Sequence, residues 1–542
     1  MNTNSSNLEE TILEIIKNTN SKNPEKIAFN SRISIFEKNI SFSEIDKKSN
    51  RLAGYMQQKL KIKKQDTVAI MMPNIIQHPI SMIATIKIGG IITNVNPLYT
   101  PRELEHQLKD SNAETIIIAS PFIETLESII KNTKIKNVII TDIPDCFSKL
   151  QFNILNFLLK YIKKSVPKCN IKDAVKFYDI LNSYEEIDYN KVKIYGSDIA
   201  FLQYTGGTTG VSKGVVLTHK NITSNIEQCN YVCSPLIKES KEVILTALPL
   251  YHIFALTINF LYFYKKQSLN VLVVNPRDQN SLIEIIKKYK PTIITGVNTL
   301  FQVIIKNKKS KEIDFSNLKL TIGGGMSVEE QVSDKWKELT GKIIIEGYGL
   351  TECSPLVACN PTDLTDFNSS IGKSIANTEV KIVDLENEEV QDGKIGELLV
   401  KGPQVMSSYW NREEETKEAL KDGWLRTGDI CYRDKKGFLY IVDRKKDMIN
   451  VSGFNVFPKE IENVLNLHKN IEESAVIGFK DKKSGESIRA FVKLKEGRQL
   501  DNEKIIAYCK KHLTSYKVPK DIKFIDEIPK SNVGKILKTE LR

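Results

Sequence analysis

The 542-residue sequence lacks an apolar run long enough to cross a membrane. A helix that spans a bilayer needs about 20 apolar residues, whereas the longest candidate, IFALTINFLYFY at 253–264, is shorter and contains Asn259. We expect this run to be a buried strand or helix. The N-terminal segment MNTNSSNLEETILEIIKNTN has no basic region ahead of an apolar block, so we also expect no signal peptide.

Cysteine motifs are absent as well. The eight cysteines include no C-x-x-C pair, and the two nearest, Cys229 and Cys233, have no histidine cluster beside them. In a chain of this size we expect reduced, buried cysteines and neither a disulfide framework nor a zinc site. The sequence therefore predicts a cytoplasmic protein.

Signatures of nucleic-acid-binding domains are also missing, although the formal net charge is +12. Residues 444–542 contribute 22 Lys and Arg against 14 Asp and Glu. Such an excess suits polyanionic small molecules or anionic lipid, and the abundance of lysine throughout the chain explains it equally well. We expect no nucleic-acid partner.

What the chain does have is an alternation of short apolar runs with helical patterns. Runs such as TVAIMMPN (67–74) alternate with amphipathic segments such as RELEHQLKDSN (102–112). Strand–helix–strand units at these intervals predict parallel sheets and an α/β fold. The apolar spacing over 42–62 predicts a helix with Ser41 or Ser43 as its N-cap.

The pattern changes after about residue 375. Short strands separated by Gly, Asp and Asn turns predict an antiparallel β subdomain over about 376–443. Residues 444–542 then alternate helix and strand in an α+β pattern. The charged segment DRKKD lies between these two patterns and places the domain boundary at Asp443–Lys446.

The segment YTGGTTGVSKG (204–214) has the composition of a phosphate-binding loop. Glycine lets the backbone approach a ligand closely, hydroxyl and N–H groups donate to oxyanions, and Lys213 supplies a positive charge. The loop is not a Walker motif, because Ser212 precedes the lysine and Gly214 follows it. A flexible surface loop is the alternative that this segment alone leaves open.

Distant segments combine glycine with carboxylates or lysines in a similar way. They are EGYGLTEC (346–353), GWLRTGD (423–429), DRKKDMINVSGFNVFPKEIE (443–462) and PKSNVGKILK (529–538). With the loop and LPLYHIFAL (248–256), they follow the order and approximate spacing of the adenylate-forming superfamily, which the chain resembles from about residue 25 to 542. This superfamily comprises acyl-CoA synthetases, amino-acid-activating adenylation domains and beetle luciferases. Within it the motifs look most like those of the bacterial long-chain fatty acid–CoA ligases.

The resemblance implies an N-terminal AMP-binding domain over 1–443, with two parallel-rich α/β subdomains and a small β-barrel-like subdomain. It also implies a small mobile α+β domain over 444–542 that acts as a lid about a hinge near Lys446. Two half-reactions would share one site. A fatty acid carboxylate attacks the α-phosphate of ATP bound with Mg²⁺, giving acyl-AMP and pyrophosphate, and the thiol of coenzyme A then displaces AMP.

The resemblance also assigns roles to residues of this sequence. The β- and γ-phosphates would be held by Thr205, Gly206, Gly207, Thr208, Thr209, Gly210 and Lys213. The adenine pocket would consist of Gly323, Gly324, Gly325, Glu346, Gly347 and Tyr348, whose ring stacks on the base. The further assignments are Thr351 to the α-phosphate, Glu352 to Mg²⁺, Asp429 and Arg444 to the ribose, and Lys446 and Gly453 to the cofactor-binding part of the mobile domain.

Two further assignments concern the chemistry. Lys535 would bridge the acyl carboxylate and the α-phosphate during adenylation, where a cation stabilises the charge of the transition state. His252 stands where the family places an aromatic residue or a histidine beside the acyl carboxylate. A structural histidine is the alternative.

The stretch 251–264, which we expect to line the acyl pocket, bears on the nature of the acid. It contains no Asp or Glu. An amino acid would need a buried carboxylate for its ammonium group, so an amino acid is disfavoured. A long alkyl chain gains about 0.8 kcal/mol for each buried CH₂ group. A medium-chain, aryl or hydroxycinnamic acid stays open as the substrate, as does a non-catalytic nucleotide-binding protein of the same fold.

Residues 149–168, KLQFNILNFLLKYIKKSVPK, combine aromatic and aliphatic residues with a basic end. Such a segment suits peripheral contact with the anionic inner face of a membrane. Packing in the core is the alternative. A homodimer is also compatible with the sequence.

Overall fold

A mixed eight-stranded sheet has the strand order β19-β9-β8-β4-β3-β5-β6-β7. The computed structural model describes residues 10–162, 166–182, 188–205, 212–451, 454–481, 485–531 and 536–542. From β8 to β7 all neighbouring strands are parallel, and β9 and β19 add antiparallel strands beyond β8. The strands are β3 (Thr67–Met71), β4 (Ile91–Asn94), β5 (Thr115–Ala119), β6 (Asn137–Thr141), β7 (Val175–Lys176), β8 (Ile199–Thr205), β9 (Lys213–Thr218) and β19 (Ser408–Tyr409). The predicted strand within 67–74 is confirmed as β3, which is buried at every position.

A nine-stranded sheet follows the order β16-β15-β14-β13-β12-β10-β11-β1-β2. Its central strands from β14 to β1 are parallel, and antiparallel strands close both ends. The strands are β1 (Ile27–Ile33), β2 (Phe36–Ser41), β10 (Val243–Thr246), β11 (Leu269–Leu272), β12 (Ile293–Gly296), β13 (Leu320–Gly323), β14 (Ile345–Gly349), β15 (Leu356–Cys359) and β16 (Lys373–Ser374). The predicted parallel-rich α/β architecture is therefore confirmed in two sheets.

The helices that accompany these sheets begin where local signals place them. Helix α2 (Phe42–Gln58) starts after Ser41, whose hydroxyl accepts the N–H of Glu44 while the Glu44 carboxylate accepts the N–H of Ser41. This reciprocal cap selects Ser41 over Ser43 as the N-cap. The other helices of this part are α1 (Ile12–Lys22), α3 (Gln77–Lys87), α4 (Pro101–Asp110), α5 (Ile123–Glu127), α6 (Lys149–Phe157) with the π-helical turn η4 (Leu158–Ile162), α7 (Phe177–Asn182), α8 (His219–Cys233), α9 (Phe263–Lys265), α10 (Gln279–Tyr289), α11 (Asn298–Lys306) and α12 (Glu330–Thr340).

The apolar run at 253–264 is confirmed as a buried helical segment. It forms the π-helical stretch η5 (Ala255–Tyr262), every residue of which is buried, and continues into α9. Across the described residues, no helix is both long enough and apolar enough to cross a membrane.

A third, smaller sheet is antiparallel throughout, as predicted for the segment after residue 375. Its strands are β17 (Glu379–Val383), β18 (Gly396–Lys401), β20 (Leu420–Lys421), β21 (Trp424–Arg433) and β22 (Leu439–Arg444), and α13 (Glu413–Ala419) precedes β20. Strand β21 pairs with β18, β20 and β22. In the described part of the chain the two end strands, β17 and β20, do not pair with each other, so this sheet is open and not a closed barrel.

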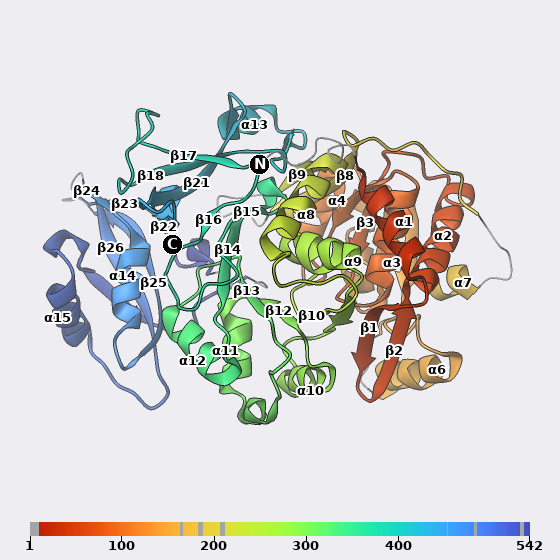
Figure 1. Cartoon of the computed structure of the whole chain (residues 1–542), viewed down its shortest axis with the longest axis horizontal. Helices are drawn as coiled ribbons and strands as arrows, with labels where there is room; N and C mark the ends of the chain where they lie inside the picture. Colours follow the sequence, from red (N-terminus) through yellow and green to blue (C-terminus); the bar gives the residue numbers. More distant parts are fainter. Residues whose placement is uncertain are drawn as a thin grey trace.

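The C-terminal part forms a separate α+β domain with its own core. Its strands are β23 (Ile449–Val451), β24 (Phe454–Val456), β25 (Ile471–Asp481), β26 (Gly485–Leu494) and β27 (Asp521–Phe524), and its helices are α14 (Pro458–Asn466) and α15 (Asn502–His512). Figure 1 shows this domain in blue, beside α11 and α12. An ion pair crosses between the two parts, with Lys306 Nζ 3.7 Å from the Glu472 carboxylate.

Candidate active site

The predicted phosphate loop leaves the eight-stranded sheet as a hairpin. Strand β8 ends at Thr205, β9 begins at Lys213, and these two residues are opposite each other in the antiparallel register. The predicted residues Gly206, Gly207, Thr208, Thr209 and Gly210 lie outside the described residues. The structure therefore places the two ends of the loop side by side.

The Lys213 side chain contacts a segment that the sequence analysis did not single out. Its ammonium group forms an ion pair with Glu415 of α13 and lies 5.2 Å from the centroid of the Tyr409 ring. Tyr409 is held there because β19 pairs with β9. Its hydroxyl donates to Glu352 Oε1 at 2.8 Å. The structure thus links the loop lysine to the glutamate that was expected to bind Mg²⁺.

A second cluster joins the residues predicted for adenine and ribose. Tyr348 on β14 donates its hydroxyl to Asp429 Oδ2 at 2.5 Å, and Arg444 Nε lies 2.7 Å from Asp429 Oδ1. Asp429 and Arg444 are opposite each other on β21 and β22. Burial raises the pKa of the Tyr348 hydroxyl, and the Asp429 carboxylate raises it further.

The two clusters share one electrostatic environment. Burial acts to lower the pKa of Arg444, but Asp429, Tyr348 and Glu352 together raise it. Glu352 therefore influences the same guanidinium group that pairs with Asp429. Thr351 starts the short 3-10 turn η7 (Thr351–Cys353) that follows β14, so it lies between Tyr348 and Glu352 in the chain.

The glycine run 323–325 allows a close approach between neighbouring segments. A Cβ atom added at Gly324 would lie 3.0 Å from the carbonyl oxygen of Gly347 and 3.0 Å from Phe254 Cε1. A side chain there would push these neighbours apart, so glycine suits the position. The run therefore lies against β14 on one side and against the LPLYHIF segment on the other.

Glu346 precedes Gly347 on β14 and is buried. Burial raises the pKa of its carboxyl group to about 8, although Lys459 acts to lower it. The sequence analysis did not identify Lys459, which lies on α14 of the C-terminal domain and bonds through its ammonium group to the Ser327 hydroxyl. The C-terminal domain thus contacts, through a lysine, the segment that follows the glycine run 323–325.

His252 lies in a turn that is anchored to β8. Gln203 Nε2 of β8 donates to the Tyr251 carbonyl at 2.5 Å, and His252 Nδ1 accepts the N–H of Phe254 at 3.3 Å. Because Phe254 also lies against Gly324, the turn connects the strand before the phosphate loop to the glycine run.

Three predicted residues belong to the C-terminal part. Lys446 lies in the turn η8 (Lys445–Asp447), between β22 of the third sheet and β23 of the fourth. Gly453 and Lys535 lie outside the described residues. Tyr409 and Glu415 lie outside the segments quoted from the sequence, and Lys459 lies within the segment 443–462 without a predicted role. Each meets its partner only through a contact between residues far apart in the chain.

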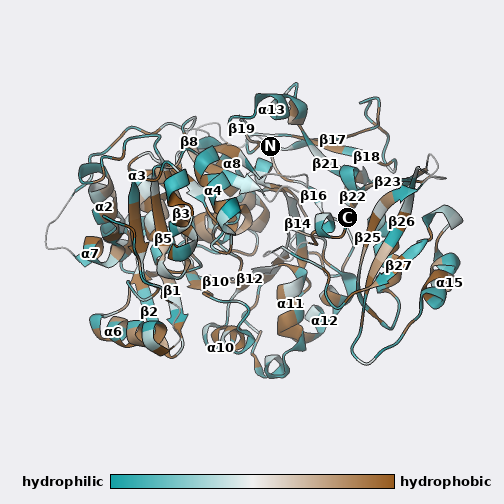
Figure 2. Ribbon diagram, turned by 180° about the vertical axis from the view of Figure 1, so that it is seen from behind, coloured by the Kyte–Doolittle hydropathy of each residue, from teal (hydrophilic) through white to brown (hydrophobic). Residues whose placement is uncertain are grey.

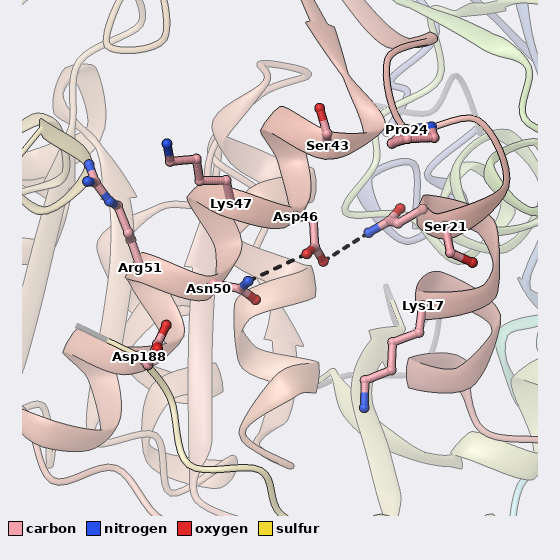
Figure 3. Close-up of a pocket in the computed structure, with 10 residues that line it drawn as sticks. Lys17, Ser21, Pro24, Ser43, Asp46, Lys47, Asn50, Arg51 and Asp188 are labelled. Carbon is pink, nitrogen blue, oxygen red and sulfur yellow. Dashed lines mark hydrogen bonds between the residues drawn. The ribbon is translucent and has the colours of Figure 1, made fainter. Parts of the chain in front are cut away.

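A separate cavity of about 400 Å³ lies between α1 and α2 (Figure 3), and none of the predicted site residues lines it. Its lining residue Asp46, on α2, bonds to side chains of both α1 and α3. Asp46 accepts bonds from Asn20 at 3.1 Å and from the buried Lys87 at 2.7 Å, and Lys87 also bonds to Ser49 and Asn50. Burial lowers the pKa of Lys87, against the opposing effect of Asp46. This network anchors α3 to α2 and does not belong to the candidate active site.

The chain belongs to the AMP-binding enzyme family. The family model described as AMP-binding enzyme matches residues 16–410, and that of the AMP-binding enzyme C-terminal domain matches residues 460–535. The predicted superfamily is therefore confirmed.

Named relatives agree with this assignment. A Long-chain-fatty-acid–CoA ligase of Salmonella typhimurium is 50% identical over 503 residues, which cover 93% of this chain and 90% of that protein. The 4-coumarate–CoA ligase 3 of Arabidopsis thaliana is 32% identical over 89% of this chain and 83% of its own length. The crystal structure of ATP-bound MatB from Rhodopseudomonas palustris matches with a TM-score of 0.85 over 98% of both chains at 24% identity, so it shares the fold.

Proposed function

We propose that this chain is a long-chain fatty acid–CoA ligase. It activates a fatty acid carboxylate with ATP, giving acyl-AMP and pyrophosphate, and then transfers the acyl group to the thiol of coenzyme A with release of AMP. The observation that carries the proposal is that residues of separate motifs converge in two clusters: Lys213 and Glu352 both contact Tyr409, and Asp429 pairs with Arg444 beside Tyr348. They do so in a chain that is 50% identical to a ligase of that name.

The contacts of the described residues support specific roles toward the nucleotide. Lys213 and the loop from Thr205 hold the β- and γ-phosphates, and Thr351 meets the α-phosphate. Asp429 accepts the ribose hydroxyls, while Arg444 orients its carboxylate. Tyr348 stacks on the adenine. In-line attack at phosphorus depends on charge neutralisation and positioning, which these groups supply.

Glu352 is the residue that fits Mg²⁺. One of its oxygens is oriented by the Tyr409 hydroxyl, and a carboxylate oxygen is the hard ligand that Mg²⁺ prefers. Among the described residues, no group of three or more His, Cys, Asp or Glu side chains could hold a metal alone. In this proposal the ion is bound through the Glu352 carboxylate and the substrate phosphates. When bound, it would neutralise charge on the phosphate oxygens.

An apolar acid suits the segment that follows His252. Every residue of η5 is buried, and its one amide, on Asn259, donates to Thr295 Oγ1 at 2.8 Å and to Thr246 Oγ1 at 3.2 Å. The segment therefore offers no carboxylate for an ammonium group. In this proposal His252 lies beside the acyl carboxylate.

An aryl acid is the second candidate, because a relative named 4-coumarate–CoA ligase also matches over most of the chain, at 32% identity. The test is pyrophosphate release with long-chain, medium-chain, hydroxycinnamic and amino acids, with and without coenzyme A. Palmitate or oleate should give the highest kcat/KM, and thioester should form only when coenzyme A is present. Thioester from aryl acids alone would refute the fatty acid assignment. Absence of pyrophosphate release with every acid would indicate a non-catalytic nucleotide-binding protein.

Lys535 tests the mechanism itself. A cation that bridges the carboxylate and the α-phosphate acts only in the first half-reaction, so Lys535→Ala should reduce acyl-AMP formation by about 10²-fold or more. Thioester formation from supplied acyl-AMP should change far less. Lys523→Ala, at an exposed position on β27, is the matched control. Equal loss in both steps would contradict the assigned role.

We also propose that residues 444–542 move about a hinge near Lys446, so that Lys535 and the loop with Gly453 face the site in turn. A disulfide that fixes one domain orientation should support one half-reaction and block the other.

Peripheral contact with an anionic membrane would bring the ligase to its lipid substrate. A homodimer stays a prediction, and light scattering during size-exclusion chromatography measures it.

A further inference from the structure

Helix α6 with η4 has apolar residues on two faces, and one of them packs against the molecule. On the inner face Leu155 and Leu159 are buried, and the Phe152 ring stacks on Tyr178 with centroids 4.6 Å apart. The helix begins at a capping box formed by Ser148. These contacts hold the segment in place, and its second apolar face takes no part in them.

The second face is a stripe of large apolar side chains exposed to solvent. Leu150 is 71% exposed, Ile154 39%, Phe157 57% and Tyr161 61%. Their spacing of four, three and four residues puts them on one side of a helix. The rings of Phe157 and Tyr161 lie 5.2 Å apart, so the stripe is continuous there. An exposed apolar stripe of this kind is typical of an interaction surface.

The stripe lies at one edge of the molecule. In Figure 2, α6 carries hydrophobic colour on its exposed ribbon, and both views place it at the same edge as the turn between β1 and β2. That turn carries Ile35, another large apolar residue with an exposed side chain.

Lysines outnumber acidic residues in the sequence around the stripe. From residue 148 to 176 the sequence has seven lysines and one aspartate. Lys149 and Lys160 are exposed on the helical segment itself, and Lys160 Nζ lies 5.7 Å from the Tyr161 ring centroid. Within the described residues, neither lysine has a carboxylate at ion-pair distance.

We infer that this surface, the α6 stripe of Leu150, Ile154, Phe157 and Tyr161 with its flanking lysines, docks on an anionic lipid bilayer. The apolar side chains would enter the interface between head groups and acyl chains, and the lysines would meet lipid phosphates. A second copy of this chain fits less well, because a twofold pairing of the stripe would place lysines against lysines. The inference rests on the peripheral membrane contact proposed above and assigns a surface to it, and its test does not require the ligase activity.

The test is sedimentation of the full chain with phosphatidylglycerol vesicles and with neutral phosphatidylcholine vesicles. We expect binding to the anionic vesicles that weakens as salt is added, and little binding to the neutral ones. Leu150→Ser should weaken binding about tenfold or more, because the Leu side chain no longer enters the bilayer. Lys160→Gln should weaken it about fivefold at low salt and less at high salt.

Leu385→Ser is the matched control, since Leu385 is 72% exposed and follows β17, a strand that lies far from α6 in Figure 1. It should bind vesicles like the wild type. All variants should keep wild-type pyrophosphate release with a soluble medium-chain acid in the absence of vesicles, which shows that they are folded. Failure of the wild type to sediment at low salt, or equal binding by Leu150→Ser and Leu385→Ser, would overturn the inference. A dimer in light scattering that Leu150→Ser dissociates would assign the stripe to a second copy instead.

Discussion

The ion pair between Lys213 and Glu415 gives a direct test of the proposed triphosphate site. Glu415 places a carboxylate on the ammonium group that the β- and γ-phosphates would need. ATP must therefore displace Glu415 before Lys213 can bind it. Glu415→Gln removes this competing charge and keeps the shape of the side chain, so we expect the KM for ATP to fall and kcat to change little.

The size of the effect follows from exposure. The two side chains are 31% and 33% exposed, and an ion pair of this kind contributes up to about 1 kcal/mol. Removing an ion pair of this strength should change the KM for ATP about two- to fivefold, since 1.4 kcal/mol corresponds to about a tenfold change in a binding constant. The difference between variant and wild type should shrink as salt is raised, because partly exposed charges are screened.

The assay is initial-rate pyrophosphate release at varied ATP with saturating fatty acid. Glu414→Gln is the matched control, because Glu414 lies on the same helix and pairs with Lys417, away from Lys213. It should leave the KM unchanged. A rise in KM for Glu415→Gln would show that Glu415 positions Lys213 for ATP, and an equal change in both variants would show a general charge effect. Either result refutes the reasoning.

Three other substitutions test separate parts of the structure. Tyr409→Phe removes the hydroxyl that orients Glu352, so the Mg²⁺ concentration for half-maximal pyrophosphate release should rise up to about tenfold. An unchanged Mg²⁺ concentration would contradict the role of Glu352. Trp336→Ala leaves a cavity at a fully buried site and should lower the free energy of unfolding by about 3–5 kcal/mol in urea titrations. A loss below about 1 kcal/mol would contradict the tight packing around Trp336. Burial raises the pKa of Asp145 to about 8, so the folded protein keeps a proton that the unfolded chain loses near pH 4. The contribution of Asp145 to the free energy of unfolding is therefore fully present below about pH 4 and is lost as the pH rises toward 8. Asp145→Asn should therefore gain melting temperature relative to wild type as pH rises from 5 to 8, whereas a parallel pair of curves would contradict this sign, and the exposed Asp173→Asn should follow the wild type.

Local elements of this fold could be predicted because their causes lie within a few residues of each other. The cap at Ser41 starts α2, and the apolar run 67–74 forms β3. The buried run 253–264 could be recognised as buried but not assigned to strand or helix, because a short apolar run satisfies both periods. In the structure this run is helical and packs against α8 and against β10 of the nine-stranded sheet, contacts that no local pattern specifies.

Part of the candidate site was also accessible from the sequence. Tyr348, Asp429 and Arg444 each stand in a motif whose order and spacing resemble a known superfamily, and the structure joins them. Tyr409 and Glu415 stand in no such motif, and Lys459 lies in the segment 443–462 without a predicted role. Their contacts with Glu352, Lys213 and Ser327 span 57, 202 and 132 residues, and nothing local encodes a pairing at that range.

By itself the sequence therefore determined the family, the α/β class, the positions of the main strands and helices, and the motifs that carry the chemistry. These follow from local periodicity, capping and the order of motifs. Tertiary structure alone decided which carboxylate meets Lys213, whether the small antiparallel sheet closes, and which apolar face of α6 is buried. Residues 149–162 have apolar side chains on both faces, and only the position of the neighbouring elements determines which face packs inward and which stays in contact with solvent.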